Sequence, residues 1–446
     1  MDLLDPLFGS ETVTQIFSSG NTIQRMLDVE AALARAESNA GVIPPSAAES
    51  IAAKCHADLF DPSALAKAAA LAGNLAIPLV KQLTALVSAS DKDAARYVHW
   101  GATSQDVIDT ALILQARAAL DHIDSELASL CEALARLADQ HRSTPAVART
   151  WMQHAVATTL GLKVAGWLDA LKRHCARIHH LHHGVLALQF GGAAGTLASL
   201  GDHGLAVAGA LAEELSLALP DLPWHAHRDR VAEIATTLAL LVGTLGKIAR
   251  DVSLLSQTEV GELSEPAAEG RGGSSTMPQK QNPVSCAVVL AAAVRVPGLT
   301  STMLISMLQE NERALGGWHA EWETLPEIFR LTAGAVHHML ETISGLQIDS
   351  ERMRENLEQT HGLIFGEAVV MALARHMGKS QAHNIVECAC RHALAEKRHL
   401  RDVLREQPEV AAHLKENELD KLFAAQSSTG MAEQFIDRVL SSMENR

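Results

Sequence analysis

Aromatic residues are scarce in this sequence. Six Trp, one Tyr and eight Phe make up 3% of the 446 residues, although hydrophobic residues as a whole reach 48%. A core with so few rings must be packed from Ala, Leu and Val, which favours closely packed helices over β-sandwiches. We find no convincing run of alternating apolar and polar residues, so the sequence predicts an all-α fold.

Positive charge is also in short supply. The 37 Lys and Arg residues are outnumbered by 52 Asp and Glu residues, which gives a formal net charge of -15 at pH 7. Nucleic-acid binding needs clustered Lys and Arg against the phosphates, so we expect no nucleic-acid partner. If the substrate is an anion, its site must be a local cationic exception in an acidic protein.

Membrane, export and metal-binding signals are missing from the sequence. No window reaches the roughly 18 uninterrupted apolar residues of a membrane span, and residues 1–6 contain neither a basic start nor an apolar signal core. The six cysteines are scattered, and Cys388 and Cys390, the close pair, would point in different directions on a helix. We expect reduced thiols, no metal or organic cofactor, no membrane partner and a cytoplasmic protein.

Long amphipathic helices account for the middle of the chain. Apolar residues recur in alternating steps of three and four along residues 120–137, 160–181 and 231–255. A fourth apolar stretch, residues 288–308, contains Pro297, which we expect to kink the helix rather than end it. Helices of about 30 residues extend roughly 45 Å. Such long apolar faces indicate that partner subunits cover them.

The two ends of the chain differ from this central block. Residues 1–107 consist of shorter helical segments broken by Gly and Pro. Beyond residue 350 the predicted helices are again short, and the sequence carries more charged residues. The sequence therefore predicts three helical domains. These are an N-terminal domain (1–107), a central bundle of long helices (108–350) and a C-terminal domain (351–446).

Residues 261–283 form an irregular stretch that helix packing does not explain. Asn282 precedes a proline, as an N-cap does, and the N–H groups after that proline would face an anion held by Lys280. The glycines would allow Ser274 and Ser275 to close over a ligand. No Gly-Lys-Ser/Thr follows them, so the stretch is not a P-loop. A flexible linker remains the alternative, and spacing alone favours it.

Residues 99–106 form a second irregular stretch, directly before a long helix. Thr103 or Ser104 could cap that helix or bind a ligand, and the local sequence supports both readings. His99 taken alone is more often a structural histidine than a catalytic one.

These stretches resemble conserved regions of the fumarase/aspartase superfamily. Residues 273–283 (GSSTMPQKQNP) resemble its signature loop, residues 99–110 (HWGATSQDVIDT) its first region, and residues 148–155 (ARTWMQHA) its second. Residues 25–30 and 435–437 fit as well, so the resemblance spans nearly the whole chain. It implies a homotetramer with a core of roughly twenty helices. It also implies shared active sites, each assembled from the three regions on three different subunits.

The resemblance implies a role for each residue of the site. Ser274 would transfer the proton, and Lys280 and Asn282 would stabilise charge that develops during the reaction. Arg313, and with it Arg271, would supply the local positive charge. The residues expected to bind substrate are His99, Thr103, Ser104, Thr150, Gln153, His154, Ser275 and Arg313.

One departure from the superfamily pattern bears on the reaction. Where the second region of the lyases has Thr-His, this chain has Thr150-Trp151, and His154 could replace the missing His only in part. An amine or hydroxyl leaving group needs a proton from that His, whereas a carboxylate, with a pKa of about 4, leaves as the free anion. The stretch 309–322 (QENERALGGWHAEW) also resembles the 3-carboxymuconate cycloisomerases of the superfamily.

The resemblance and this departure together imply a lactonising enzyme. It would interconvert 3-carboxy-cis,cis-muconate, a small tricarboxylate, and a carboxymuconolactone in protocatechuate (β-ketoadipate) catabolism. The steps would be intramolecular addition of a carboxylate and protonation of carbon. Two alternatives remain open. One is an adenylosuccinate- or argininosuccinate-type lyase that releases fumarate, and the other is a non-catalytic structural relative.

Overall fold

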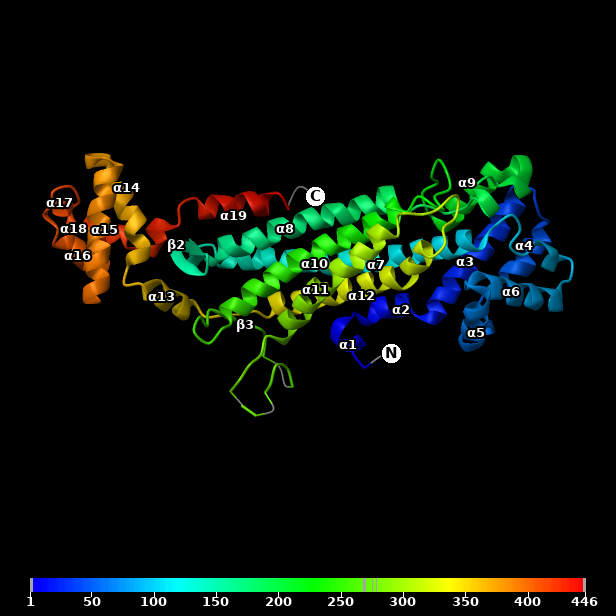
Figure 1. Cartoon of the computed structure of the whole chain (residues 1–446), viewed down its shortest axis with the longest axis horizontal. Coiled ribbons are helices and arrows are strands. Elements are labelled where there is room, and N and C mark those ends of the chain that lie inside the picture. The colour runs from blue at the N-terminus through cyan, green and yellow to red at the C-terminus, as the bar shows by residue number, and fades with distance from the viewer. Residues whose placement is uncertain (1–2, 268–269, 275, 278, 444–446) are drawn as a thin grey trace. The chain divides into compact units, whose positions relative to one another are not determined.

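Helices dominate the structure, which confirms the predicted all-α class (Figure 1). The computed structural model describes residues 3–267, 270–274, 276–277 and 279–443. Five long helices account for most of the middle of the described chain. They are α7 (Ser104–Gln140), α8 (Leu160–His180), α10 (Asp229–Leu255), α11 (Val284–Ile305) and α12 (Gly317–Ser344).

The predicted apolar seams lie on these long helices and are buried. Leu134 on α7, Leu171 on α8 and Leu245 on α10 are all fully buried. Pro297 lies inside α11 and does not end it. Small residues take the place of rings where helices meet, since a Cβ added to Gly246 of α10 would lie only 2.7 Å from the Cβ of Ala293 of α11. This close approach is what a core poor in aromatic residues requires.

The chain divides into two compact units, each drawn from three stretches. The first comprises Met1–Ala128, Arg173–Gly246 and Val288–His338, and the second comprises Ser129–Lys172, Lys247–Ala287 and Met339–Arg446. The cuts between these stretches fall within or beside the long helices. The three domains expected from the sequence, with boundaries near residues 107 and 350, therefore remain a prediction.

The first unit adds shorter helices to its share of the long ones. The helix α3 packs against α4 and α9, and its buried face carries Glu30 and Glu37 among apolar side chains. The helices that lie wholly within this unit are α1 (Asp5–Phe8), α2 (Glu11–Ile16), α3 (Ser19–Asn39), α4 (Pro45–Ala52), α5 (Pro62–Ala72), α6 (Ala76–Ser90) and α9 (Gly204–Leu215).

The second unit contains strands that the sequence analysis missed. An antiparallel hairpin is formed by β1 (Pro145–Thr150) and β2 (Gln153–Thr159), and a smaller pair by β3 (Leu263–Ser264) and β4 (Gln347–Ile348). Val147 of β1 and Ala157 of β2 are buried in the core of the C-terminal helices. The hairpin is thus held by one buried face.

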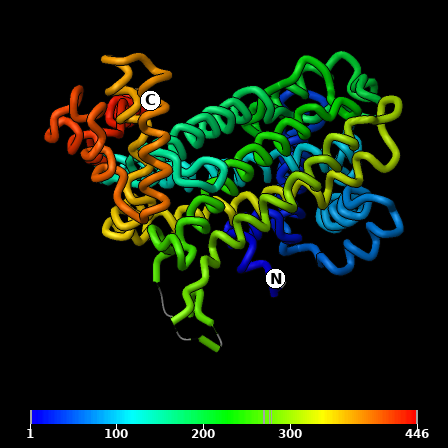
Figure 2. Tube along the Cα trace, turned by 60° about the vertical axis from the view of Figure 1, so that its left-hand side comes forward, coloured from blue at the N-terminus to red at the C-terminus, as the bar shows by residue number. Residues whose placement is uncertain are grey.

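The C-terminal helices α14 to α18 gather into one cluster (Figure 2), whereas α19 contacts α8 through Lys172, whose ammonium donates to the carbonyl of Val439. The helices of this region are α13 (Ser350–Glu358), α14 (Gly366–Met377), α15 (Lys379–Glu396), α16 (Leu400–Arg405), α17 (Pro408–Ala411), α18 (Glu416–Leu422) and α19 (Ala432–Ser441).

Two helices, α10 and α11, are long and apolar enough by composition to cross a membrane. Buried helices of helical proteins have the same composition, and 61% of the apolar window of α10 is buried within the chain. In α11 only 33% of the window is buried, and Val294 and Ile305 are 79% and 67% exposed. Several apolar side chains of this helix are therefore exposed in a single chain.

Candidate active site

In the first unit, the predicted site residues gather at the start of α7. The N–H of Thr103 donates to the Asp106 carboxylate (3.0 Å), and the Thr103 hydroxyl accepts from the Arg313 guanidinium (2.9 Å). The helix α7 begins at Ser104, so Thr103 occupies its N-cap position. The carboxylate in the first turn belongs to Asp106, and the Thr103 hydroxyl is left to pair with Arg313.

Arg313 binds a second segment as well. Its Nη2 donates to the carbonyls of Ala193 (2.9 Å) and Gly192 (3.4 Å). Its Nε is buried and has no hydrogen-bond acceptor within the described residues. The guanidinium is half-buried and fixed on two sides, as a group that binds a planar carboxylate must be.

Asp106 ties these segments together. Its buried carboxylate accepts from the N–H groups of Gly191 (3.0 Å) and Gly192 (2.9 Å) and lies 2.7 Å from Nε2 of His225. With the bond from Thr103, four donors converge on one side chain. The turn before α7 and the segment that Arg313 contacts are therefore held in one fixed arrangement.

His99 lies in the same turn and pairs with a distant residue. Its Nδ1 is 2.6 Å from Oε1 of Glu30, whose side chain is fully buried on α3. The backbone of His99 has a positive φ of 61°, which is costly for a residue with a side chain. Burial acts to lower the pKa of His99, but the charge and hydrogen bond of Glu30, with the charge of Asp106, raise it above its usual value.

A buried ion cluster lies one turn further along α7. The Arg228 guanidinium donates to Asp109 (2.7 and 3.1 Å) and to Glu321 (3.0 Å), and the indole N–H of Trp318 also donates to Asp109 (2.8 Å). Burial opposes the charge on Arg228, but the two carboxylates raise its pKa. The sequence analysis missed this cluster. The feature that could have indicated it is the pair Asp106 and Asp109, two acidic residues three positions apart at the start of an otherwise apolar helix.

In the second unit, the second conserved region forms the tip of the β1–β2 hairpin. Thr150 and Gln153 face each other in register, and Trp151 and Met152 between them both have positive φ, 50° and 65°. The Trp151 side chain is 97% exposed. Two large apolar side chains thus occupy a turn that normally selects Asn and Gly.

A buried carboxylate fixes the hairpin one position away from its turn. Arg149 donates to both oxygens of Glu262 (2.5 and 3.1 Å), and Asn356 donates to Glu262 as well (2.7 Å). His154 lies beside this pair, and its Nδ1 is buried without a partner in the part of the chain that the structure describes. Burial, and next the charge of Arg149, lower the pKa of His154, so it is neutral at pH 7.

The signature loop lies between α10 and α11 and projects from the helices (Figures 1 and 2). The Ser274 hydroxyl accepts from the N–H groups of Met277 (3.1 Å) and Thr276 (3.3 Å). The Lys280 side chain is exposed, and Ser275 lies outside the described residues. Asn282 donates through its backbone N–H (2.9 Å) and its side-chain amide (3.1 Å) to the carbonyl of Gly272, which closes the loop at its base.

The expected anion site at the N-terminus of α11 is wrong. The helix begins at Val284, and the N–H groups of Ser285 and Cys286 donate to the buried carboxylate of Glu265 (3.1 and 2.7 Å). The helix dipole therefore stabilises Glu265 rather than a ligand. The Asn282 side chain is used by the loop and does not cap the helix.

Arg271 is likewise committed within this unit. It donates to the Ser285 hydroxyl (2.6 Å) and pairs with Glu341 (3.3 Å). A cavity of about 190 Å³ lies beside it, under the loop. Residues that line this cavity include Ser256, Ser264, Glu265, Arg271 and Asn282.

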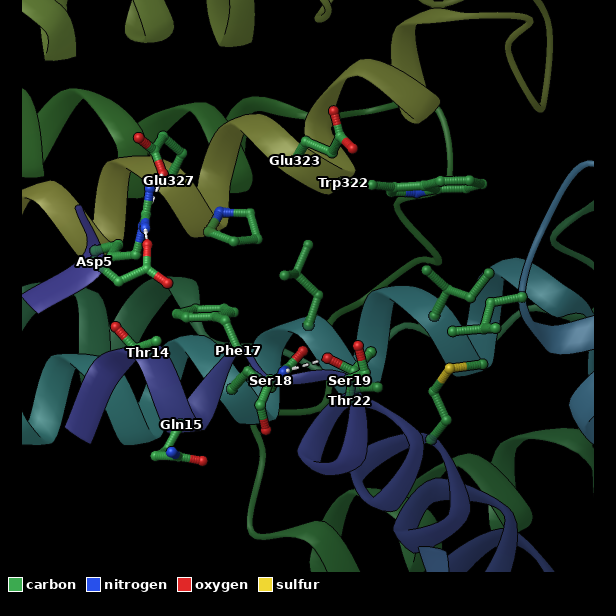
Figure 3. Close-up of a pocket in the computed structure, with 18 residues that line it drawn as sticks. Asp5, Thr14, Gln15, Phe17, Ser18, Ser19, Thr22, Trp322, Glu323 and Glu327 are labelled. Carbon is green, nitrogen blue, oxygen red and sulfur yellow. Dashed lines mark hydrogen bonds and ion pairs between the residues drawn. The ribbon is translucent and has the colours of Figure 1, made fainter. Parts of the chain in front are cut away.

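A further cavity lies in the first unit, and none of the predicted site residues lines it. It measures about 760 Å³. Figure 3 shows Phe17 and Trp322 among the lining residues, with Asp5 and Glu327 at one end. Arg330 forms ion pairs with both of these carboxylates. The sequence analysis did not single out this cavity, because its lining comes from helices far apart in the chain.

Two known protein families match successive parts of the chain. Residues 6–298 match the lyase family, and residues 362–439 match the adenylosuccinate lyase C-terminus. The chain is 54% identical to a 3-carboxy-cis,cis-muconate cycloisomerase of Pseudomonas aeruginosa, over 98% of this chain and 96% of that one. A protein of the same name from Bradyrhizobium diazoefficiens is 53% identical, over 99% and 98%. The solved 3-carboxy-cis,cis-muconate lactonizing enzyme of Pseudomonas putida superposes with a TM-score of 0.95 at 49% identity and covers 99% of both chains.

Proposed function

Because this chain belongs to the lyase family of the fumarase/aspartase superfamily, we propose that it is a cycloisomerase acting on 3-carboxy-cis,cis-muconate. The contact between Arg313 and Thr103 carries the proposal. It joins the stretch that resembles the cycloisomerases to the first conserved region. The relatives that match over nearly the whole chain support the same reaction.

The reaction needs no redox step. An oxygen of one substrate carboxylate forms a C–O bond to a carbon of a double bond, and the π electrons move onto the neighbouring carbon, where a second carboxylate delocalises them. A proton then bonds to that carbon, which leaves a five-membered lactone. Holding the attacking carboxylate close to the acceptor carbon supplies much of the rate, as in other well-oriented intramolecular reactions.

Ser274 is the proposed proton donor. Its oxygen already accepts two backbone N–H groups of the loop, so its own proton remains available. The same two donors stabilise the alkoxide that forms when the proton leaves, which lowers the cost of using a weak acid. In the reverse direction the alkoxide removes the proton. Lys280 and Asn282 are proposed to stabilise the negative charge on the substrate.

The other predicted residues are proposed to bind the substrate carboxylates. Arg313, His99 and Thr103 act from the first unit, and Ser104 lies beside Thr103. Thr150, Gln153 and His154 act from the hairpin, and Ser275 acts from the loop. Trp151 cannot exchange a proton near neutral pH, so its ring is proposed to cover the diene and exclude water.

A homotetramer with shared sites is the proposed assembly. The exposed apolar side chains of α11, Val294, Leu304 and Ile305, support it, because exposed apolar side chains that gather on one helix are typical of a contact with another copy. The enzyme is proposed to act in the cytoplasm, in protocatechuate (β-ketoadipate) catabolism.

A direct assay tests the proposed reaction. Purified protein is incubated with 3-carboxy-cis,cis-muconate, and the loss of its conjugated-diene absorbance is followed. We expect turnover in the wild type and a loss of about 10- to 1000-fold in kcat/KM for Arg313→Lys, which keeps the charge but loses bidentate geometry. An unchanged spectrum with the wild type would refute the proposal.

A further inference from the structure

The contact between Glu30 and His99 suggests a function for Glu30 that the sequence did not indicate. We infer that Glu30 is a positioning residue that holds His99 as an imidazolium with Nε2 directed to the substrate, so that His99 is a fixed cationic ligand for a substrate carboxylate. The inference rests on the proposed function for the identity of that anion.

The geometry leaves His99 one ring nitrogen for a ligand. Nδ1 is bound to Glu30 at 2.6 Å, and the His99 side chain keeps 18% of its surface exposed. Nε2 is therefore the nitrogen that remains for a ligand. His99 lies four residues before Thr103, whose hydroxyl accepts a hydrogen bond from the Arg313 guanidinium. The turn thus contains one cationic group, His99, and contacts another, Arg313.

The backbone of this turn supports a functional reading. His99 has a left-handed φ of 61°, where glycine would be free of strain. Such strain persists where surrounding contacts fix it, and it clusters at ligand-binding positions. Here the fixing contact comes from Glu30, 69 residues earlier in the chain and fully buried.

The charges around His99 favour its protonated form. Glu30 faces it from α3 and Asp106 from α7. Glu37, two turns beyond Glu30 on α3, has a pKa raised to about 9 by burial and by the charge of Glu30, so it is neutral at pH 7. Burial and the charges of Glu30 and Asp28 likewise raise the pKa of Cys55, which keeps its thiol protonated. Glu30 is thus the anion that balances His99.

The test removes the charge of the Glu30 side chain and keeps the shape of that side chain. In Glu30→Gln the amide oxygen can still accept from Nδ1, but the pKa of His99 falls. An imidazolium is present below its pKa and lost above it, so the alkaline limb of kcat/KM should move to lower pH by about one unit. KM should rise about tenfold at pH 8 but less than about threefold at pH 6, with kcat nearly unchanged.

Glu37→Gln is the matched control, since it removes the other buried carboxylate from the same face of α3. We expect it to leave the pH dependence of kcat/KM in place. Equal shifts in both variants, or a KM increase in Glu30→Gln that is the same at pH 6 and pH 8, would overturn the inference.

A measurement on the wild type keeps the test independent of variant folding and of the substrate. Protein labelled with 13C at histidine Cε1 is titrated by NMR, and the His99 signal is identified by its absence in His99→Gln. We expect a pKa above the usual 6.5. A value at or below 6.5 refutes the imidazolium even if lactone forms. A raised value without turnover leaves the pair intact and refutes the proposed function.

Discussion

At the scale of single residues, two buried carboxylates on α3 carry different charges. Glu30 is balanced by His99, whereas both oxygens of Glu37 lack a hydrogen-bond partner in the part of the chain that the structure describes. Burial, and next the charge of Glu30, raise the pKa of Glu37 from 4.5 to about 9. Because the pKa of Glu37 is higher in the folded than in the unfolded chain, the folded chain keeps Glu37 protonated at pH values between the two.

This proton predicts a pH dependence of stability. Between about pH 4.5 and pH 9 the unfolded chain ionises Glu37 while the folded chain does not, so stability falls as the pH rises. The loss is at most about 1.4 kcal/mol per pH unit. Glu37→Gln should remove this loss, which urea unfolding at pH 6 and pH 8 would measure. The exposed Glu49→Gln on α4 is the control, and an unchanged slope in Glu37→Gln would contradict the assignment.

The Ser274 hydroxyl gives a second prediction at this scale. Ser274→Ala should lower turnover of 3-carboxymuconate by about a hundredfold or more, because proton transfer loses its donor. Assembly should be unaffected, since the loop projects from the helices (Figure 2). Turnover and sedimentation are measured together, with the exposed loop residue Gln279→Ala as control. Full activity in Ser274→Ala would remove the serine from the mechanism.

At the scale of elements, the hairpin tip is built against local preference. Trp151 and Met152 both hold positive φ in a two-residue turn, at a cost of about 1 kcal/mol or more each. Asn and Gly would form this turn without that cost. The strain is accounted for if the two side chains are needed where they stand, over the substrate.

The double variant Trp151→Asn/Met152→Gly separates stability from function. It should raise the free energy of unfolding by about 1–2 kcal/mol, because the strain is relieved. It should also lower kcat/KM by at least about tenfold, because the ring that is proposed to cover the substrate is lost. Lys397→Gly is the control, since Lys397 also has a positive φ of 52° at the end of α15, away from the predicted site residues. That control should gain stability and keep full activity.

The elements also show which features the sequence could predict. Long helices were predicted because their apolar period continues over many turns, as at Leu134 and Leu245. The hairpin was missed because its strands have six and seven residues rich in Ala and Thr, too few to establish a period of two. The anion site at α11 was wrong because Glu265, 20 residues before Ser285, takes its N–H groups. Contacts between residues so far apart in the sequence can be recognised only once the folded structure is known.

At the scale of the whole molecule, a single chain leaves the apolar side of α11 uncovered. Val294, Leu304 and Ile305 are exposed along it. If other copies cover this helix and share the sites, two inactive variants with different defects should complement each other. Mixed Ser274→Ala and Thr103→Val subunits should recover part of the wild-type turnover after exchange. Monomers in sedimentation, or no recovery despite proven exchange, would count against shared sites.

The central claim is that Trp151 marks a reaction in which a carboxylate attacks and leaves without a proton-exchanging residue at that position. The most direct measurement is product analysis for the wild type and Trp151→His on three substrates: 3-carboxymuconate, adenylosuccinate and argininosuccinate. We expect the wild type to form lactone from the first and to release no fumarate from the others. Trp151→His should lose lactonisation without gaining fumarate release, because Arg313 keeps its contact with Thr103 and, with it, its proposed role in binding a substrate carboxylate. Fumarate release by the wild type at about 1 to 1000 per second, the range typical of enzymes, would contradict the account and establish a lyase.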